Sequence, residues 1–160
     1  MKQIIASLSL SFAGVLVTGL VSWGGCCFAA EAGGQADREK PEQAYERLLG
    51  VKQFAFGGVG YAGTTSDGEQ AFRAVRASTN AVQLFRAALS NGSNEAKLYA
   101  LCAIRQMDNR SFATDAKAFL RANPEVTTMS GCIVGHERAA AVVKRIAAGY
   151  YDNQASSTRR

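Results

Sequence analysis

The residues best suited to catalysis or metal binding are a thiol and an imidazole in the C-terminal part of the chain. His136 is the only histidine of the chain, and Cys132 precedes it by four residues. Such a pair can act as a nucleophile with its base, and together with Cys102 it supplies three ligands for a Cys₂His metal site. Ser130 also has a nucleophile's spacing from His136, but no G-x-S-x-G motif surrounds it. Both thiol chemistries need free cysteines, whereas the two cysteines of the exported domain are expected to form a disulfide, as argued from the leader below. We therefore predict no catalytic set, no metal site and no cofactor.

A glycine-rich segment, residues 57–63, is the second candidate site. Three of its glycines match G-x-G-x-x-G, which binds dinucleotides when a strand precedes it and a helix begins at the glycines. Here TTSD follows the glycines and no βαβ pattern is present, so a tight turn with positive φ is the simpler interpretation. Backbone N–H groups near a helix N-terminus can also hold an anion or a peptide carboxylate. The residues that would form this ligand loop are Gly57, Gly58, Gly60, Gly63 and Ser66.

The N-terminal sequence indicates export from the cytoplasm. Lys2 is followed by an uncharged run over residues 4–23 and then by small residues. This order is typical of a signal peptide, which we place at residues 1–29 with cleavage between 29 and 32. Two alternatives stay open, an uncleaved membrane anchor and a lipoprotein acylated at Cys26. The mature chain is therefore expected to be periplasmic or secreted, and membrane-bound only in those two cases.

Cleavage of the leader changes the cysteine count. Cys26 and Cys27 leave with the signal peptide, so Cys102 and Cys132 remain. Two cysteines in an exported domain predict a Cys102–Cys132 disulfide, and two free thiols are the alternative. On the chain-entropy model, a closed loop of about 30 residues would stabilise the fold by about 3.5 kcal/mol.

Composition and charge limit the class of partner. The chain has 160 residues, of which 48% are hydrophobic, and it carries 18 Lys+Arg against 13 Asp+Glu, a net charge of +5. These values suit a folded chain and favour an anionic envelope component or an unknown protein as partner. The basic residues mostly lie opposite apolar stripes, and no aromatic residues alternate with them. We therefore expect no nucleic-acid binding.

Hydrophobic periodicity predicts a mostly α-helical chain, a compact array of five to six short helices. Residues 30–40 are interpreted as a flexible tether, 41–150 as the helical domain and 151–160 as a disordered tail. The helices should pack locally as αα-hairpins in a HEAT-like manner, with the glycine-rich loop before the second helix. Residues 125–137 are expected to form an ordered loop with at most one short strand. The predicted helices span residues 41–49, 67–77, 81–90, 95–107, 111–121 and 137–148, with 95–107 at the centre.

Two stretches of the sequence, FAFGGVGYAGTTSDGEQAFRA and LYALCAIR, carry a family resemblance. The region from about residue 54 to residue 149 resembles a loosely defined family of small exported bacterial proteins, some of which are encoded beside microcin genes. The resemblance implies bacterial export, with family features at residues 54–69 and at Cys132 and Ile133. The family has no characterised activity, so no catalytic residue is carried over from it.

These observations favour an exported, non-enzymatic binding or interaction module of the bacterial envelope. The alternative is a small hydrolase-like enzyme that uses the glycine-rich loop and His136. The two functions predict different geometries, because an enzyme needs a concave pocket where the loop and His136 converge.

Overall fold

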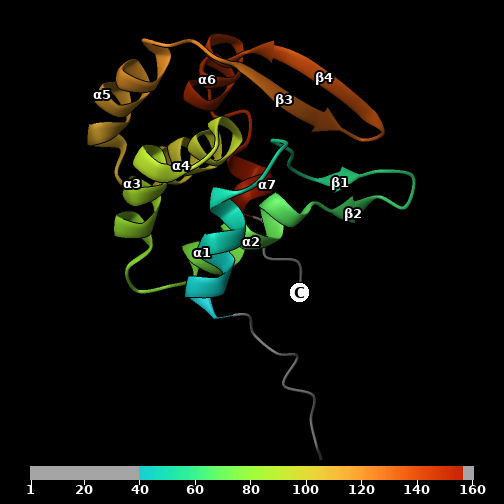
Figure 1. Ribbon diagram of the computed structural model, residues 1–160, viewed down its shortest axis with the longest axis horizontal. Helices are drawn as coiled ribbons and strands as arrows, with labels where there is room; N and C mark the ends of the chain where they lie inside the picture. The colour runs from blue at the N-terminus through green and yellow to red at the C-terminus, as the bar shows by residue number, and fades with distance from the viewer. Residues whose placement is uncertain (1–39, 157–160) are drawn as a thin grey trace, which may run out of the picture. The chain divides into compact units, whose positions relative to one another are not determined.

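The computed structural model describes residues 40–156, which belong to one unit of the chain. Helices dominate it, and two antiparallel hairpins, β1–β2 and β3–β4, supply the strands (Figure 1). The elements, in chain order, are α1 (Pro41–Leu49), β1 (Gly58–Val59), β2 (Thr64–Thr65), α2 (Asp67–Arg76), α3 (Ala81–Asn91), α4 (Asn94–Met107), α5 (Asn109–Leu120), β3 (Glu125–Ser130), β4 (Ile133–Arg138), α6 (Ala139–Ala147) and α7 (Asp152–Ser156). The predicted signal peptide, nearly all of the tether, and Cys26 and Cys27 lie outside the described residues. Among the helices of residues 40–156, none has the length and apolar character needed to cross a bilayer.

Local capping signals explain where several helices begin. The Ser66 hydroxyl accepts the Glu69 N–H at 3.1 Å, and the Ser93 hydroxyl accepts the Ala96 N–H at 3.0 Å. Each bond satisfies one of the free N–H groups of a first helical turn. Pro41 occupies the start of α1, where its missing N–H is harmless. The predicted bounds of α1 to α4 are therefore confirmed to within one residue.

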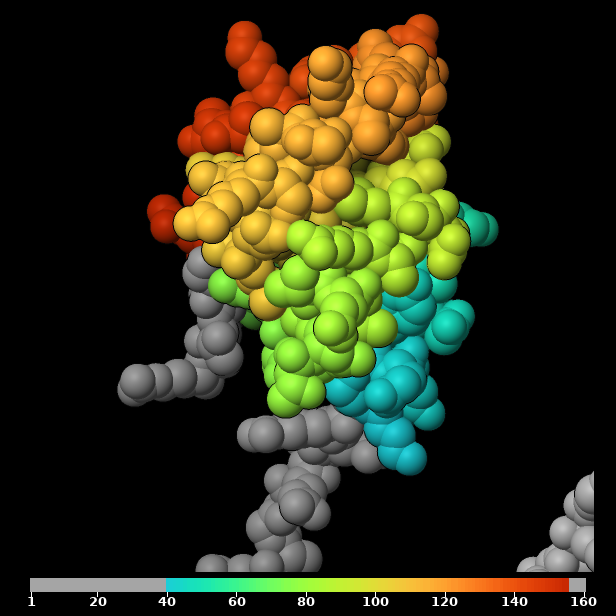
Figure 2. Space-filling view, turned by 90° about the vertical axis from the view of Figure 1, so that its left-hand side faces the viewer, coloured from blue at the N-terminus to red at the C-terminus, as the bar shows by residue number. Residues whose placement is uncertain are grey.

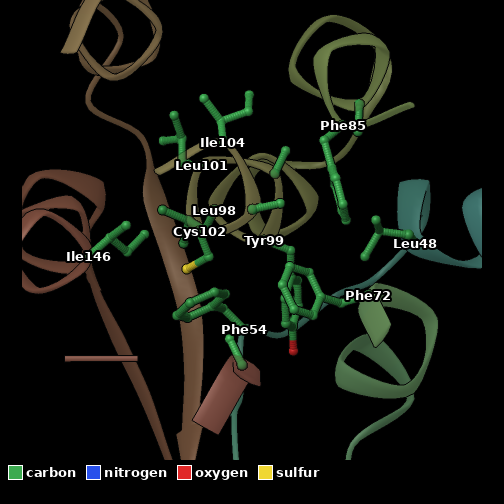
Figure 3. Close-up of a cluster of buried hydrophobic side chains, with 14 of the residues drawn as sticks. Leu48, Phe54, Phe72, Phe85, Leu98, Tyr99, Leu101, Cys102, Ile104 and Ile146 are labelled. Carbon is green, nitrogen blue, oxygen red and sulfur yellow. The ribbon is translucent and has the colours of Figure 1, made fainter. Parts of the chain in front are cut away.

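The predicted central position of α4 is also confirmed. Buried side chains surround most of the helix axis, among them Leu98, Tyr99, Leu101 and Ile104. Figure 3 shows these side chains beside aromatic residues from the other elements. The Phe54 and Tyr99 rings, for example, have centroids 4.8 Å apart. The core thus forms around α4, with α2, α3, α5 and α6 packed against it.

The segment after α5 differs from the sequence prediction. Residues 125–138 form the hairpin β3–β4, with Glu125 opposite Arg138 and Ser130 opposite Ile133. Glu137 and Arg138 therefore belong to a strand, and α6 begins two residues later than predicted. The chain is dominated by helices but is not all-α. The hairpin lies on the opposite side from the face that Figure 2 shows, which α1, α3 and α5 cover.

The predicted disordered tail is also partly wrong. Residues 152–156 form α7, and Ala155 is buried against the core. Asp152 pairs with Arg105 of α4, and the Arg76 guanidinium donates a 2.5 Å hydrogen bond to the Ala155 carbonyl. These contacts hold α7 against α2 and α4, and the Tyr151 ring just before it packs on Phe56, which precedes the glycine-rich loop.

Candidate functional site

The segment before the glycine-rich loop is anchored by hydroxyl groups. The Tyr99 hydroxyl donates to the Ala55 carbonyl at 2.6 Å and accepts the Ala55 N–H at 2.9 Å. The Ser66 hydroxyl donates to the same carbonyl at 3.0 Å. Burial raises the pKa of Tyr99, so this phenol stays protonated and keeps its donor. Ser66 therefore caps α2 and holds the neighbouring segment with one side chain.

Glu69 is the second anchor, and its position corrects the sequence interpretation. Helical periodicity predicts Glu69 on the solvent side of its helix, opposite Phe72 and Val75, yet its residue surface is only 1% exposed. Its carboxylate accepts the Gly57 N–H at 2.8 Å and pairs with Arg73, one turn along α2. The i,i+4 spacing of Glu69 and Arg73 predicts this ion pair, and the structure contains it. Outside α2, the Glu69 carboxylate binds the backbone of the glycine-rich loop.

This geometry does not support the predicted anion site at the loop. The Gly57 N–H is taken by Glu69, the Gly60 N–H donates to the Gly131 carbonyl at 2.9 Å, and the Gly63 N–H donates to the Gly60 carbonyl at 3.1 Å. Glu69 adds a buried negative charge where an anion would bind. The positive φ values of Gly57, Gly60 and Gly63, which are 88°, 69° and 60°, confirm the tight-turn interpretation instead.

Gly68 has a packing role in the sequence SDGE, residues 66–69, which also contains Ser66 and Glu69. A Cβ atom added at Gly68 would lie 2.7 Å from the Tyr99 hydroxyl oxygen. No such contact occurs in folded proteins without displacement of one group. The glycine therefore allows α2 to approach α4 closely enough for the Ser66 and Tyr99 hydroxyls to share the Ala55 carbonyl.

The predicted Cys102–Cys132 disulfide is not formed, and within residues 40–156 both cysteines are free. Cys102 is buried in α4, and burial raises the pKa of its thiol well above the ordinary value. Cys132 is exposed in the turn between β3 and β4. One thiol lies in the core and the other at the end of a protruding hairpin, so they cannot bond without rearrangement of the backbone. Among the described residues, no three metal-ligating side chains lie close enough to hold an ion.

His136 lies on an exposed position of β4 rather than at a helix start. Its Nδ1 atom is 3.3 Å from the hydroxyl of Thr127, its cross-strand neighbour. Side chains of a strand alternate between the two faces of a sheet, so His136 and Glu137 occupy opposite faces. The imidazole thus lies on the face of the hairpin away from the cleft that Glu137 lines.

That cleft, which we call the hairpin cleft, has a volume of about 330 Å³ and lies between β3–β4 and the residues that follow α6. Phe54 and Phe56 line its apolar part. Ile133 and Tyr150 also line it, although they are 76% and 65% exposed. Large exposed apolar side chains beside a concave surface are typical of a binding site.

A polar network lies within the hairpin cleft. The Arg145 guanidinium donates to Glu137 Oε1 at 2.5 Å and to the Tyr151 hydroxyl at 3.0 Å. The Thr128 hydroxyl donates to the same Glu137 oxygen at 3.0 Å. Hydrogen bonding from Arg145, with a contribution from Thr128, holds the pKa of Glu137 below 4.5, and the bond to Glu137 raises that of Arg145. The cleft therefore contains a fixed ion pair.

Two groups of this network retain hydrogen-bonding capacity. Glu137 Oε2 and the hydroxyl hydrogen of Tyr151 have no hydrogen-bond partner among the described residues. The Glu137 and Arg145 side chains are 27% and 37% exposed, so a ligand can reach them. The cleft offers one free acceptor and one free donor beside an apolar rim.

The residues of the hydrolase alternative do not meet in this cleft. Of the described residues that line it, none is His136, a cysteine or a glycine of the 57–63 loop. Comparisons with protein-family models, with curated proteins and with solved structures found no match for this chain.

Proposed function

We propose that this chain is an exported, non-enzymatic binding module of the bacterial envelope whose ligand is a peptide-like segment with an apolar side chain. The observation that carries the proposal is the Glu137–Arg145–Tyr151 network beneath the exposed Ile133 and Tyr150. The predicted leader supports export, and the family resemblance agrees with it. We expect the surrounding helices to act as a scaffold, packed as αα-hairpins in a HEAT-like manner.

The chemistry of the cleft favours a peptide group over other small ligands. An amide N–H can donate to Glu137 Oε2, and an amide carbonyl can accept from the Tyr151 hydroxyl. A neighbouring apolar side chain can cover Ile133 and Tyr150, which removes apolar surface from water. Full burial of such a side chain contributes roughly 1.5–3 kcal/mol. The hydrogen bonds then fix its orientation.

No specific observation favours the hydrolase alternative. Acyl transfer needs a nucleophile within hydrogen-bond reach of a base, together with a donor for the oxyanion. Ser130 and Glu137 line the cleft, but the Glu137 carboxylate is already engaged by Arg145 and Thr128. A carboxylate with a lowered pKa is a weak base. The arrangement suits recognition better than proton transfer.

Nuclear magnetic resonance of the isotope-labelled exported chain tests the proposal. The probe is a blocked tripeptide with a central phenylalanine, compared with the same tripeptide with a central glycine. We expect the phenylalanine probe to shift the amide signals of Ile133, Gly135 and Tyr151. The double substitution Ile133→Ser and Tyr150→Ser should weaken binding by about ten-fold, which corresponds to the loss of about 1.4 kcal/mol of apolar contact.

Met107→Ser provides a matched control for this experiment. Met107 is also an exposed apolar side chain, 41% exposed, but it ends α4 and is not part of the cleft lining. Its substitution should leave the affinity for the phenylalanine probe unchanged. Equal shifts with the two tripeptides, or equal loss of binding in Met107→Ser, would refute the proposed site.

A further inference from the structure

The outer edge of β4 presents unpaired backbone groups. On β3, the Thr127 carbonyl accepts the Phe54 N–H at 2.8 Å, and the Met129 N–H donates to the Phe54 carbonyl at 3.0 Å. These backbone groups of β3 therefore point away from β4. In an antiparallel pair, a residue whose N–H and C=O groups point away from the partner strand lies opposite a residue whose N–H and C=O groups also point away. The partners are His136 and Val134, so their N–H and C=O groups lie on the open edge.

This edge lacks the usual protection against strand pairing. Natural edge strands carry prolines, bulges or charged side chains that discourage the addition of another strand. The register of β3–β4 is continuous over six residue pairs, without a bulge. Residues 133–136 of β4 contain no proline and no Asp, Glu, Lys or Arg, and the two charged residues of the strand, Glu137 and Arg138, stand at its C-terminal end. Among residues 40–156, no strand pairs with the outer side of β4.

Charge indicates what kind of strand fits there. Arg138, at the end of β4, is exposed and forms no ion pair with any described residue, although Glu125 is its cross-strand neighbour. The chain as a whole carries a net charge of +5. A second copy would place two basic chains edge to edge, with nothing acidic on β4 to meet Arg138 except Glu137, which is held by Arg145. An acidic segment complements this edge, whereas a second copy does not.

We propose that an extended, acidic segment of a partner protein adds to the open edge of β4 as a third strand. The inference rests on the proposed function and names how the partner is held. Backbone bonds to Val134 and His136 would give affinity, as in other cases of strand addition. Alternate side chains of the added strand would turn toward the sheet face that carries Ile133, Gly135 and Glu137, which is the face of the hairpin cleft.

The test uses a blocked eight-residue peptide in which glutamate alternates with threonine and one central threonine is replaced by phenylalanine. His136→Pro removes one outward N–H without a loss to the β3–β4 ladder, whereas His136→Ala keeps that N–H. We expect His136→Pro to weaken peptide binding by up to about ten-fold, the loss of one hydrogen bond, and His136→Ala to change it by less than about two-fold. A peptide with lysine in place of glutamate should bind at least about ten-fold more weakly.

N-methylation of the peptide keeps the test valid even if His136→Pro disturbs the fold. Methyl groups on the odd-numbered peptide residues block the N–H groups of one edge of the added strand, and methyl groups on the even-numbered residues block those of the other edge. The set that blocks the edge facing β4 should abolish binding, and the other set should leave binding intact. Equal binding of the two sets, equal affinities of the His136→Pro and His136→Ala chains, or equal affinities of the acidic and basic peptides would overturn the proposal. A dimer in sedimentation equilibrium that His136→Pro dissociates would overturn it in favour of a second copy.

The blocked tripeptide separates this inference from the proposed function. It reaches the cleft through its phenylalanine and needs no strand pairing, so His136→Pro should leave its binding intact. If the tripeptide binds and the two N-methylated sets do not differ, only the strand addition is wrong. If the tripeptide does not bind either, the proposed function is wrong as well.

Discussion

Replacement of Glu69 by alanine removes the buried carboxylate that ties the glycine-rich loop to α2. The substitution removes the acceptor of the Gly57 N–H and the partner of the Arg73 guanidinium. It also leaves a small cavity, because the glutamate side chain is buried. We expect the fold to persist, since the apolar core around α4 is untouched, but its stability to fall.

The magnitude follows from the two groups left without a partner. A buried donor without an acceptor costs about 1–3 kcal/mol, and removal of one member of a buried ion pair costs about 3–5 kcal/mol. The Arg73 side chain is 28% exposed, so water replaces part of what it loses. Glu69→Ala should therefore cost about 3 kcal/mol in total. Glu69→Gln keeps an oxygen for the Gly57 N–H and should cost about 1–2 kcal/mol.

Urea unfolding at neutral pH, followed by circular dichroism, measures both values. The glutamine variant is the matched control, because it nearly preserves shape while it removes the charge. A cost below about 1 kcal/mol for Glu69→Ala would show that the carboxylate does not anchor the loop. Equal costs for the two variants would show that charge alone matters and that the bond to Gly57 contributes nothing.

Three further predictions concern stability and reactivity. Glycine to alanine in a helix usually stabilises by about 1 kcal/mol, but Gly68→Ala should destabilise by about 1–3 kcal/mol because of the tyrosine hydroxyl beside it. In Gly50→Ala the nearest atom is 4.0 Å away, so that variant should change thermal unfolding little. A reducing agent should leave the melting temperature unchanged, because both cysteines are free. Mass spectrometry should show that maleimide labels Cys132 in the folded chain but Cys102 only after unfolding. Labelling in the opposite order would contradict the structure. The pKa of Glu137 is lower in the folded chain than its unfolded value of about 4.5, so its ionised form stabilises the fold above pH 4.5, and this stabilisation is lost as the pH falls through the folded pKa. Glu137→Gln should therefore flatten the acid limb of the stability curve. An unchanged acid limb would contradict this assignment.

Local signals predicted the helices because the relevant interactions are local. Ser66, Ser93 and Pro41 act within one turn of their own helix, so their residue types suffice to place α1, α2 and α4. The same reasoning failed at Glu69, where a contact twelve residues back along the chain decides its burial. Helical periodicity correctly identified the apolar face of α2, but it could not show that the segment at Gly57 covers Glu69 on another side of the helix.

The β3–β4 hairpin was missed for a related reason. Gly131 and Gly135 interrupt the β-prone pattern of residues 125–137, so the sequence favours a loop there. In the fold, Gly131 lies in the turn with a φ of 56°, and Gly135 lies within β4 opposite Thr128. Strand propensity depends on cross-strand neighbours, which a single sequence does not display. The disulfide prediction failed likewise, since cysteine number says nothing about the distance between two thiols.

The hairpin cleft could not be predicted because its residues are chemically ordinary. Arg145 is one of many basic residues, and Glu137 had been assigned to a helix. Tyr150 ends the predicted helical domain, and Tyr151 begins the predicted tail. Their association depends on β4 and residues 150–151 lying side by side, which is a property of the tertiary fold.

The unusual residues of the loop and the ordinary residues of the cleft are nevertheless connected. Glu69 holds Gly57, the Gly60 N–H donates to the Gly131 carbonyl, and Gly131 precedes Ile133 of the cleft by two residues. Loosening the loop should therefore loosen the hairpin turn, although Glu69 does not line the cleft. We expect Glu69→Gln to speed amide exchange at Gly60 and to weaken binding of the phenylalanine tripeptide by about two- to five-fold, less than the direct Ile133→Ser and Tyr150→Ser change. Unchanged affinity with faster exchange at Gly60 would show that the loop and the cleft are independent, and that the SDGE sequence serves stability alone.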